Sequence, residues 1–192
     1  MIKEILEIAK LIPLNEGLFK DAYKVEIAGK SYFLAYDKSE FECEKQIELS
    51  QTLPRCFPKI YQYGEIEGRR FSLEEWHNLE DVYDGFKVGY FAGKLFQRSG
   101  NVHFDPKNIQ KSGKNIMFID LGHMSHGNLH DLVGTFLTEQ VGESSLEITL
   151  LFPDEFLKGI KEATGISLEK LNQVKKEVPT DYQYSNYLCS LG

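Results

Sequence analysis

The chain has 192 residues, of which 42% are hydrophobic and 27% charged, and its formal net charge is −7. These proportions are ordinary for a globular protein, and the length suffices for one hydrophobic core or two small lobes. The acidic balance argues against a dedicated nucleic-acid-binding protein, whose affinity would come mainly from cationic contacts to phosphates.

The cysteines and the lengths of the apolar runs predict the cellular compartment of the protein. Cys43, Cys56 and Cys189 are sparse and irregularly spaced, so they predict neither a disulfide framework nor a zinc ribbon. The first residues are charged from the third position and do not resemble a signal peptide, and no apolar run approaches the length of a membrane span. We therefore expect a cytoplasmic protein with no membrane contact.

The first third of the chain predicts a helix followed by a β-hairpin. Apolar residues at helical spacing predict a helix over residues 2–11, ended by Pro13. Alternating apolar residues predict strands over 23–27 and 31–36, joined by a turn at 28–30.

A second helix and two more strands follow. The helix is predicted from residue 40 to 53, with Ser39 as its N-cap and Pro54 at its end. Strands are predicted over 57–64 and 71–76. Such a β-rich first half around one helix predicts a small sheet domain.

The second half is predicted to be mainly helical. Apolar residues at helical spacing predict a long helix over 85–98, in which Gly89 and Gly93 lie four residues apart and indicate close packing. After a short hairpin and an apolar strand, further helices are predicted over three ranges: 132–140, 154–164 and 168–174.

Three oxygen-bearing side chains stand close together after the long helix. Asp105 and Asn108 fall in the segment 101–109, and Asp120 follows directly after an apolar strand predicted over 116–119. A hard cation such as Mg²⁺ takes oxygen ligands, usually with only one or two carboxylates from the protein. We therefore expect Asn108 and Asp120 to bind Mg²⁺ and Asp105 to receive the proton of an attacking hydroxyl.

These residues resemble the catalytic core of the protein-kinase-like superfamily, through Val102-His-Phe-Asp105, Asn108-Ile109 and Ile119-Asp-Leu-Gly122. That superfamily carries His-x-Asp, a downstream Asn and Asp-x-Gly after a short hairpin. The family usually has four residues between the Asp and the Asn, whereas this chain has two. A two-residue deletion would keep Asp105 as the base, and an ungapped alignment would put His103 at the base position.

The resemblance implies an α+β, two-lobed protein-kinase-like fold. A small antiparallel β-sheet N-lobe would cover residues 1–76, and a minimal, mainly helical C-lobe would cover 77–192. The C-lobe would contain the catalytic loop 101–109 and the metal-binding Asp-Leu-Gly at 120–122, and ATP would bind between the lobes with Mg²⁺. The short chain after Asp120 resembles compact atypical kinases, such as Rio-like, lipopolysaccharide-core-kinase-like and aminoglycoside- or choline-kinase-like proteins.

The N-lobe departs from the family pattern at two points. Only one of the three glycines of the nucleotide-covering loop is present, Gly17, with Phe19 at the tip of the loop. The strand lysine that holds the α- and β-phosphates in the family is replaced by Ala35. Because the loop resembles that of the with-no-lysine kinases, Lys20 is the candidate replacement, ahead of Lys38, which follows the strand.

Two further parts of a nucleotide site are implied by the same resemblance. Glu44 best matches the family's helix glutamate, which pairs with the phosphate-binding lysine, and Glu40 and Glu48 are its rivals. The strand that leads into the hinge ends at Glu74 and Trp76, whose backbone would hydrogen-bond the adenine.

Two features lie outside this core. His123, His126 and His130 are spaced as zinc ligands can be, but no cysteine or carboxylate completes the set, and Asp131 is expected instead to brace the catalytic loop, as the matching residue does in small-molecule kinases. The aromatic, polar tail at 181–187 is a candidate docking segment for a protein partner.

Two functions are compatible with these features. The first is an ATP- and Mg²⁺-dependent phosphotransferase acting on a hydroxyl of a protein or a small molecule. The second is a weakly active or inactive pseudokinase that binds a nucleotide or a protein, as favoured by Ala35, by the depleted glycine loop and by the short Asp-to-Asn spacing. Retention of both metal ligands favours the first.

Overall fold

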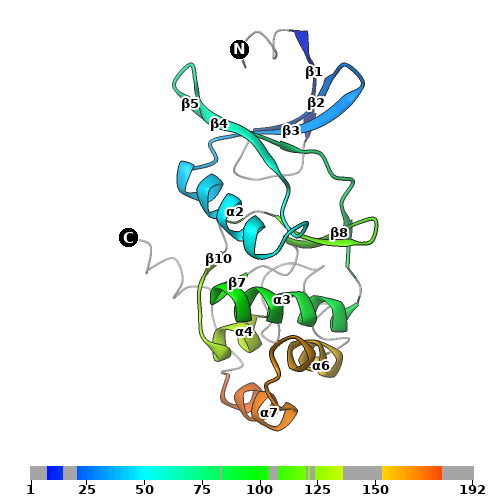
Figure 1. The fold of residues 1–192 in the computed structure, drawn as a ribbon, viewed down its shortest axis with the longest axis vertical. Coiled ribbons are helices and arrows are strands. Elements are labelled where there is room, and N and C mark those ends of the chain that lie inside the picture. Colours follow the sequence, from blue (N-terminus) through cyan, green and yellow to red (C-terminus); the bar gives the residue numbers. More distant parts are fainter. Residues whose placement is uncertain are drawn as a thin grey trace. The chain divides into compact units, whose positions relative to one another are not determined.

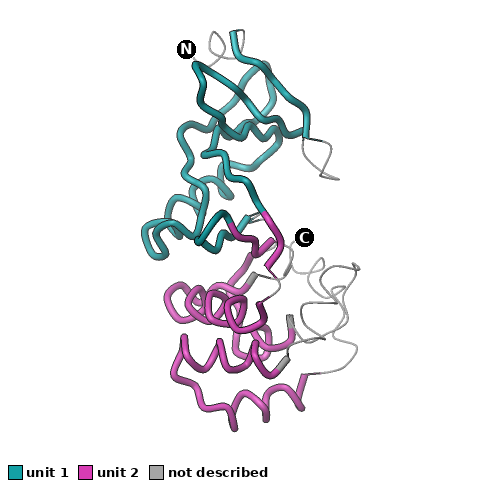
Figure 2. Tube along the Cα trace, turned by 90° about the vertical axis from the view of Figure 1, so that its right-hand side faces the viewer, with its two compact units in different colours: residues 1–79, 112–121 teal, residues 80–111, 122–192 magenta. Residues whose placement is uncertain are grey.

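The computed structural model describes residues 8–14, 21–82, 84–103, 108–119, 121, 124–135 and 153–178. The chain forms two compact units, which are described here one at a time. Unit 1 consists of Met1–Leu79 and Ser112–Leu121, and unit 2 of Glu80–Lys111 and Gly122–Gly192 (Figure 2). The sequence predicts a lobe boundary between residues 76 and 77 from the order of the motifs. That boundary stays a prediction, separate from this division into units.

Unit 1 is built on a five-stranded antiparallel sheet of order β1-β2-β3-β5-β4 (Figure 1). Its strands are β1 (Lys10–Leu14), β2 (Ala22–Ile27), β3 (Lys30–Tyr36), β4 (Ile60–Ile66) and β5 (Arg69–Glu75). The predicted hairpin is confirmed as β2–β3. Ala28 and Gly29 form its turn with φ of 49° and 77°, a left-handed conformation that glycine adopts without strain.

The first strand corrects the sequence prediction. Residues 10 and 11 were expected to end a helix, and they begin β1 instead, in which Pro13 lies opposite Tyr23 of β2. Among the described strands, β1 has a neighbour on one side only, and an edge strand tolerates proline because the missing N–H can fall on the unpaired side. Helical spacing of apolar residues could not reveal this edge position. Residues 2–7 of the predicted helix lie outside the described residues.

Helix α2 (Glu40–Thr52) lies against the sheet in unit 1 (Figure 1). Its predicted N-cap is confirmed. Ser39 Oγ accepts a hydrogen bond from Glu42 N, and the Glu42 carboxylate accepts one from Ser39 N, which together form a capping box. Leu53 is the C-cap, directly before Pro54. The residue types around the helix therefore fix both of its ends.

Two parts of the core of unit 1 can be seen among the described residues. Val25, Leu34, Phe71 and Leu73 pack together on one face of the sheet. Elsewhere in the unit, Phe118 at the end of β9 (Asn115–Phe118) stacks on Phe57 at a centroid distance of 5.4 Å. Residues 112–121 thus complete unit 1 although they follow much of unit 2 in the sequence.

Unit 2 is organised on the crossing of α3 (Gly85–Ser99) and α6 (Pro153–Thr164). A Cβ added at Gly89 would overlap the carbonyl oxygen of Phe156, and one at Gly159 would overlap that of Phe86. The helix backbones therefore touch where their glycines meet. The close packing that the sequence indicated for Gly89 is confirmed.

The other elements of unit 2 are short. β6 (Glu80–Asp81) pairs antiparallel with β8 (Ile109–Ser112), and β7 (Asn101–His103) with β10 (Met124–His126). The other helices among the described residues of unit 2 are α4 (Leu129–Thr135) and α7 (Leu168–Glu177). The helices predicted over 154–164 and 168–174 are confirmed. The helix predicted over 132–140 begins earlier, at Leu129, and its residues 136–140 lie outside the described part of the chain.

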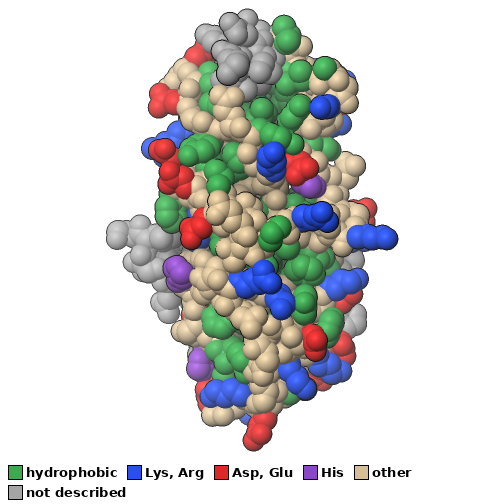
Figure 3. Space-filling model, viewed as in Figure 1, with side chains coloured by type: hydrophobic (Ala, Val, Ile, Leu, Met, Phe, Trp, Pro, Cys, Tyr) green, Lys and Arg blue, Asp and Glu red, His purple; other side chains and the backbone are tan. Residues whose placement is uncertain are grey.

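The described surface has mixed character. On the face drawn in Figure 3, basic and acidic side chains are interspersed with hydrophobic ones. Among the described helices, none is long and apolar enough to cross a membrane.

Candidate functional site

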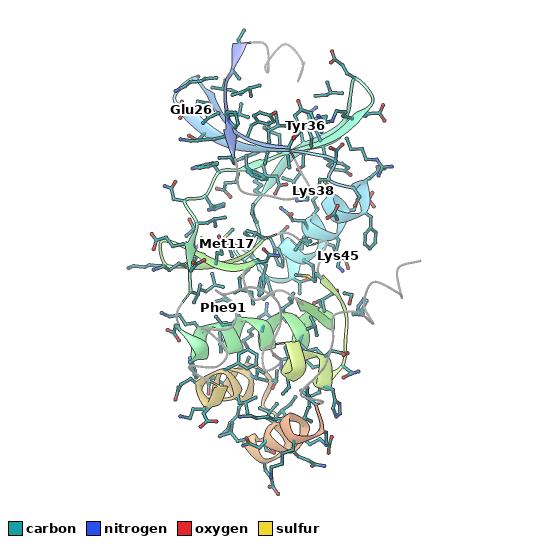
Figure 4. The ribbon with its side chains drawn as sticks, turned by 180° about the vertical axis from the view of Figure 1, so that it is seen from behind. Glu26, Tyr36, Lys38, Lys45, Phe91 and Met117 are labelled. Atoms are coloured by element: carbon teal, nitrogen blue, oxygen red, sulfur yellow. The ribbon has the colours of Figure 1, made fainter. Side chains whose placement is uncertain are left out.

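The chain turns inward directly after β3. Asp37 has a φ of 63°, in the left-handed region, and its N–H donates to the carbonyl oxygen of Arg70 at 2.8 Å. The next side chain, that of Lys38, is only 7% exposed. A left-handed corner therefore carries a lysine from the end of a strand into the interior of unit 1, between the sheet and α2 (Figure 4).

Lys38 joins a buried polar network. Its Nζ donates to Oε1 of Glu74 at 2.7 Å and to Oε1 of Gln46 at 2.8 Å. Gln46 Nε2 donates in turn to Oε2 of Glu74 at 2.9 Å and to the carbonyl oxygen of Pro58 at 2.6 Å. Ser72 Oγ donates to Oε1 of Glu74 at 2.7 Å. One loop, one helix and one strand thus meet at a single carboxylate.

The bonding of this network is nearly complete. Both carboxylate oxygens of Glu74 and all of the polar atoms of the Gln46 amide have partners. Two acceptors hold the Lys38 ammonium, which has three N–H groups, and no third acceptor lies among the described residues. Burial of an ion pair is costly unless its members are hydrogen-bonded in this way. The site is therefore a buried, oriented ammonium group paired with one carboxylate.

The other residues that the sequence proposed for the nucleotide are distributed through unit 1. Glu44 is exposed, whereas Cys43 and Gln46 face inward. At 3.6 residues per turn, residues three apart share a face and the residue next to either one does not, so Glu44 lies beside this inner face, and its pairing with a phosphate-binding lysine stays a prediction. The helix presents a neutral amide, Gln46, where the resemblance implied a carboxylate.

The strand that was expected to lead into the hinge is partly a paired strand of the sheet. Glu74 pairs with Phe33 of β3 and Ile60 of β4, so its backbone lies inside the ladder and its side chain in the network. Trp76 follows the end of β5, and its indole N–H donates to the side chain of Asn78 at 3.1 Å. Lys24 Nζ lies 5.2 Å from the centroid of the Trp76 ring, a cation–π contact.

The loop between β1 and β2 holds three more candidates. Gly17, Phe19 and Lys20 lie outside the described residues, and their nucleotide contacts stay predictions. Asp21 follows them directly, and its carboxylate accepts from Arg69 Nη1 at 3.0 Å. Arg69 Nη2 also donates to Asp37 at 2.5 Å. Hydrogen bonds to Asp37 and then Asp21 raise the pKa of Arg69, so a fixed cation links the end of this loop to the corner before Lys38.

Sequence reasoning did not predict the burial of Lys38 and did not consider Gln46. The signal was present in the helix phase. Cys43, Gln46 and Leu49 recur every three residues and all are buried, so the inward polar residue of α2 could have been read as Gln46. A lysine directly before the N-cap Ser39 lies at the start of the same helix and can fold back along its buried face.

In unit 2, the strands fix both ends of the expected catalytic loop. Met124 of β10 pairs with His103, the last residue of β7, and Ser125 with Val102. Val102 and Ile109 are each 1% exposed, so buried residues anchor the segment on both sides.

The predicted catalytic and metal residues are described to different extents. Asn108 is half-buried, directly before β8. His103 is placed by its backbone alone. Asp105 and Asp120 lie outside the described residues, so their roles stay predictions.

Asp131 lies in the first turn of helix α4 and exchanges hydrogen bonds with Asn128, the residue directly before the helix. Its carboxylate accepts from Asn128 N at 2.7 Å, and its own N–H donates to Asn128 Oδ1 at 3.2 Å. A Cβ at Gly127 would lie 3.1 Å from the Asp131 Cβ and 2.8 Å from a methyl of Val102. Asp131 is thus held near β7, and its bracing of the catalytic loop stays a prediction. His130 Nε2 lies within hydrogen-bonding distance, 2.9 Å, of Oε2 of Glu177 on α7.

No protein-family model matches the sequence, and no curated protein matches it either. Solved structures do. WaaP in complex with acyl carrier protein gives a TM-score of 0.59 at 14% identity, over 95% of this chain and 93% of that one. The autoinhibited serine kinase domain of the giant muscle protein titin gives 0.50 at 14% identity, over 93% of this chain and 76% of that one. At such identity the likeness concerns the fold.

Proposed function

We propose that this chain, which has the protein-kinase-like fold, is an ATP- and Mg²⁺-dependent phosphotransferase that transfers the γ-phosphate to a hydroxyl group. The α+β class and the kinase-like fold expected from the sequence are confirmed. The observation that carries the proposal is that this fold extends over 95% of the chain while the sequence retains Asp105, Asn108 and Asp120 in the kinase-like order. Fold alone does not establish chemistry, and these three residues supply it.

The residues fit a magnesium ion by their chemistry. Asn108 and Asp120 offer an amide oxygen and a carboxylate, which are the hard ligands that Mg²⁺ prefers. Bound Mg²⁺ would neutralise charge on the β- and γ-phosphates. Asp105, or His103 in the alternative alignment, would orient the acceptor hydroxyl and take its proton. Gly17, Phe19 and Lys20 would cover the phosphates, and the backbone at Trp76 would bind the adenine.

The alternative function is a nucleotide- or protein-binding module with weak or no activity. Ala35 favours it, because the strand position that carries a lysine in the family is here a buried alanine, 2% exposed. Since WaaP was solved with acyl carrier protein, a protein partner is a reasonable proposal for this chain too, with the tail at 181–187 as its docking segment. The mixed surface charge and the net charge of −7 give no reason to propose a nucleic acid.

Two measurements separate the proposals. The first is a thermal-shift titration with ATP, with and without Mg²⁺, on the wild type and Asp120→Asn. A ligand that binds only the native state raises its melting temperature, so we expect a Mg²⁺-dependent rise that Asp120→Asn removes. The second is release or transfer of labelled γ-phosphate, which Asp105→Asn should abolish while ATP binding persists. No shift at millimolar ATP and Mg²⁺ would contradict the enzyme, and a shift without any turnover would favour the binding module.

A further inference from the structure

Position 35, where the family carries its strand lysine, has a defined place in the sheet. Ala35 pairs with Ala22 of β2 and with Ser72 of β5. Residues opposite one another on paired strands point to the same face, as do residues two apart on one strand. Ala35, Ser72 and Glu74 therefore share a face, and a lysine at position 35 would have extended its ammonium along that face toward Glu74.

The ammonium of Lys38 reaches this same carboxylate from outside the strand. It bonds to Glu74 Oε1, the atom that also accepts from Ser72. Asp37, with its left-handed φ, lies between the last residue of β3 and Lys38, and its N–H donates to the carbonyl oxygen of Arg70. The corner is fixed in turn by the ion pair of Asp37 with Arg69. An ammonium group three residues after position 35 thus bonds to the carboxylate that a lysine at position 35 would have faced.

The neutral side chain of Gln46 leaves the ammonium of Lys38 able to bind an anion. The charges of Lys38 and Glu74 cancel, and Gln46 adds two hydrogen bonds to the pair without adding charge. A carboxylate at position 46 would make the network net negative and would repel a phosphate. With glutamine there, the network is neutral and the remaining N–H of Lys38 can be donated to an anion. A hydrogen bond from an ionised donor to a phosphate is among the stronger ones in proteins.

We propose that Lys38, held by Gln46 and Glu74, is the phosphate-binding cation of this chain and replaces the lysine missing from strand position 35. The inference rests on the proposed function, because it names a residue of the same nucleotide site. It also assigns the main anchoring role to Lys38 and leaves Lys20 a supporting one.

The test measures binding of ATP and of adenosine separately. Lys38→Met combined with Glu74→Gln removes both charges, so that no buried charge is left unpaired. Loss of a charged hydrogen bond should weaken ATP binding by about tenfold to a hundredfold, with adenosine binding unchanged. Lys45→Met, on the half-buried lysine that lies over Phe41 of α2, is the matched control and should leave both affinities unchanged.

A rescue variant makes the assignment specific. Ala35→Lys together with Lys38→Met, with Glu74 retained, puts a lysine back on the strand and should restore most of the ATP affinity. Circular dichroism checks the folding of each variant. In the wild type, the NMR signal of the Lys38 side chain, assigned by Lys38→Arg, should shift with ATP and not with adenosine, which provides a readout without a disruptive variant.

The outcomes distinguish the two levels of the proposal. Wild type that binds adenosine and ATP equally overturns the phosphate site, and wild type that binds neither overturns the proposed function as well. A third outcome concerns Lys38 alone. If the wild type prefers ATP, but the folded Lys38→Met/Glu74→Gln variant binds ATP with unchanged affinity or the NMR signal of Lys38 does not move, the role of Lys38 is overturned. In that case Lys20→Met should abolish the preference for ATP.

Discussion

A single glutamine amide connects three parts of unit 1. Gln46 accepts from Lys38, donates to Glu74 and donates to the carbonyl oxygen of Pro58. Its side chain is 3% exposed, so water cannot replace any of these bonds without opening the structure. A buried polar group that is fully bonded specifies one arrangement, and the same group with a bond missing is costly. Gln46 therefore fixes the position of α2 on the sheet.

We predict that Gln46→Leu destabilises the protein. The substitution is close in size, but it leaves Lys38, Glu74 and the Pro58 carbonyl each short of one partner in a buried site. Unsatisfied buried groups cost about 1–3 kcal/mol each in protein mutants, so the free energy of unfolding should fall by at least about 1 kcal/mol. Urea denaturation measures it.

The control uses a neighbouring position on the same helix. Glu44 is exposed, so Glu44→Gln should change the free energy of unfolding by less than about 0.5 kcal/mol. Equal stability of Gln46→Leu and wild type would show that the network contributes little, and the positioning argument for Lys38 would then lose its support.

At the scale of elements, the α3–α6 crossing organises unit 2. Alanine normally stabilises a helix relative to glycine by about 1 kcal/mol, so glycines in the middle of α3 need a reason. The reason is contact. A Cβ at Gly93 would lie 2.8 Å from the Cβ of Ala163, and one at Gly89 would overlap the backbone of Phe156. Backbone atoms cannot move aside as the end of a side chain can.

Gly89→Ala should therefore destabilise despite the better helix propensity. Overpacking in a well-packed core costs about 1–3 kcal/mol, which outweighs the propensity gain. Gln97→Ala, at an exposed position of the same helix, has the same product residue and should be neutral or slightly stabilising. Thermal denaturation of both variants would settle the sign, and a rise in melting temperature for Gly89→Ala would contradict the close crossing.

The elements that the sequence predicted well are those with local determinants. The capping pair Ser39 and Glu42 and the left-handed Gly100 that ends α3 act within a few residues, so their effects can be read from neighbouring positions. β1 could not be predicted in this way. Whether Pro13 ends a helix or lies in a strand depends on its having one neighbouring strand rather than two, and that is decided by the order of the whole sheet.

The candidate site shows the same limit in its chemistry. The sequence identified the absent strand lysine at Ala35, because a motif position can be compared directly. It ranked Lys38 below Lys20 because the burial of Lys38 depends on the Asp37 corner and on Glu74, which lies on a strand much later in the chain. Non-local partners of this kind decide which of several lysines is buried, and spacing along the chain carries no record of them.

At the scale of the whole molecule, the path of the chain makes unit 1 depend on a late segment. Residues 112–121 belong to unit 1, and they bring Phe118, which is fully buried, onto Phe57. Phe118 N also donates to the carbonyl oxygen of Cys56 at 2.7 Å. A chain ending at Leu79 would lack this ring and this hydrogen bond, so unit 1 cannot complete its core from its first segment alone.

We predict that Phe118→Ala lowers the stability of unit 1 in particular. Removal of a buried phenylalanine ring costs about 3–5 kcal/mol, which is a large share of the about 5–15 kcal/mol that stabilises a typical domain. Hydrogen exchange measured by mass spectrometry should show faster exchange in β4 and β5, because local stability falls first where packing is lost. Phe41→Ala, whose ring on α2 is 70% exposed, is the matched control within the same unit. Unchanged exchange in β4 and β5, with the loss appearing first in α6 and α7, would mean that residues 112–121 stabilise unit 2 instead.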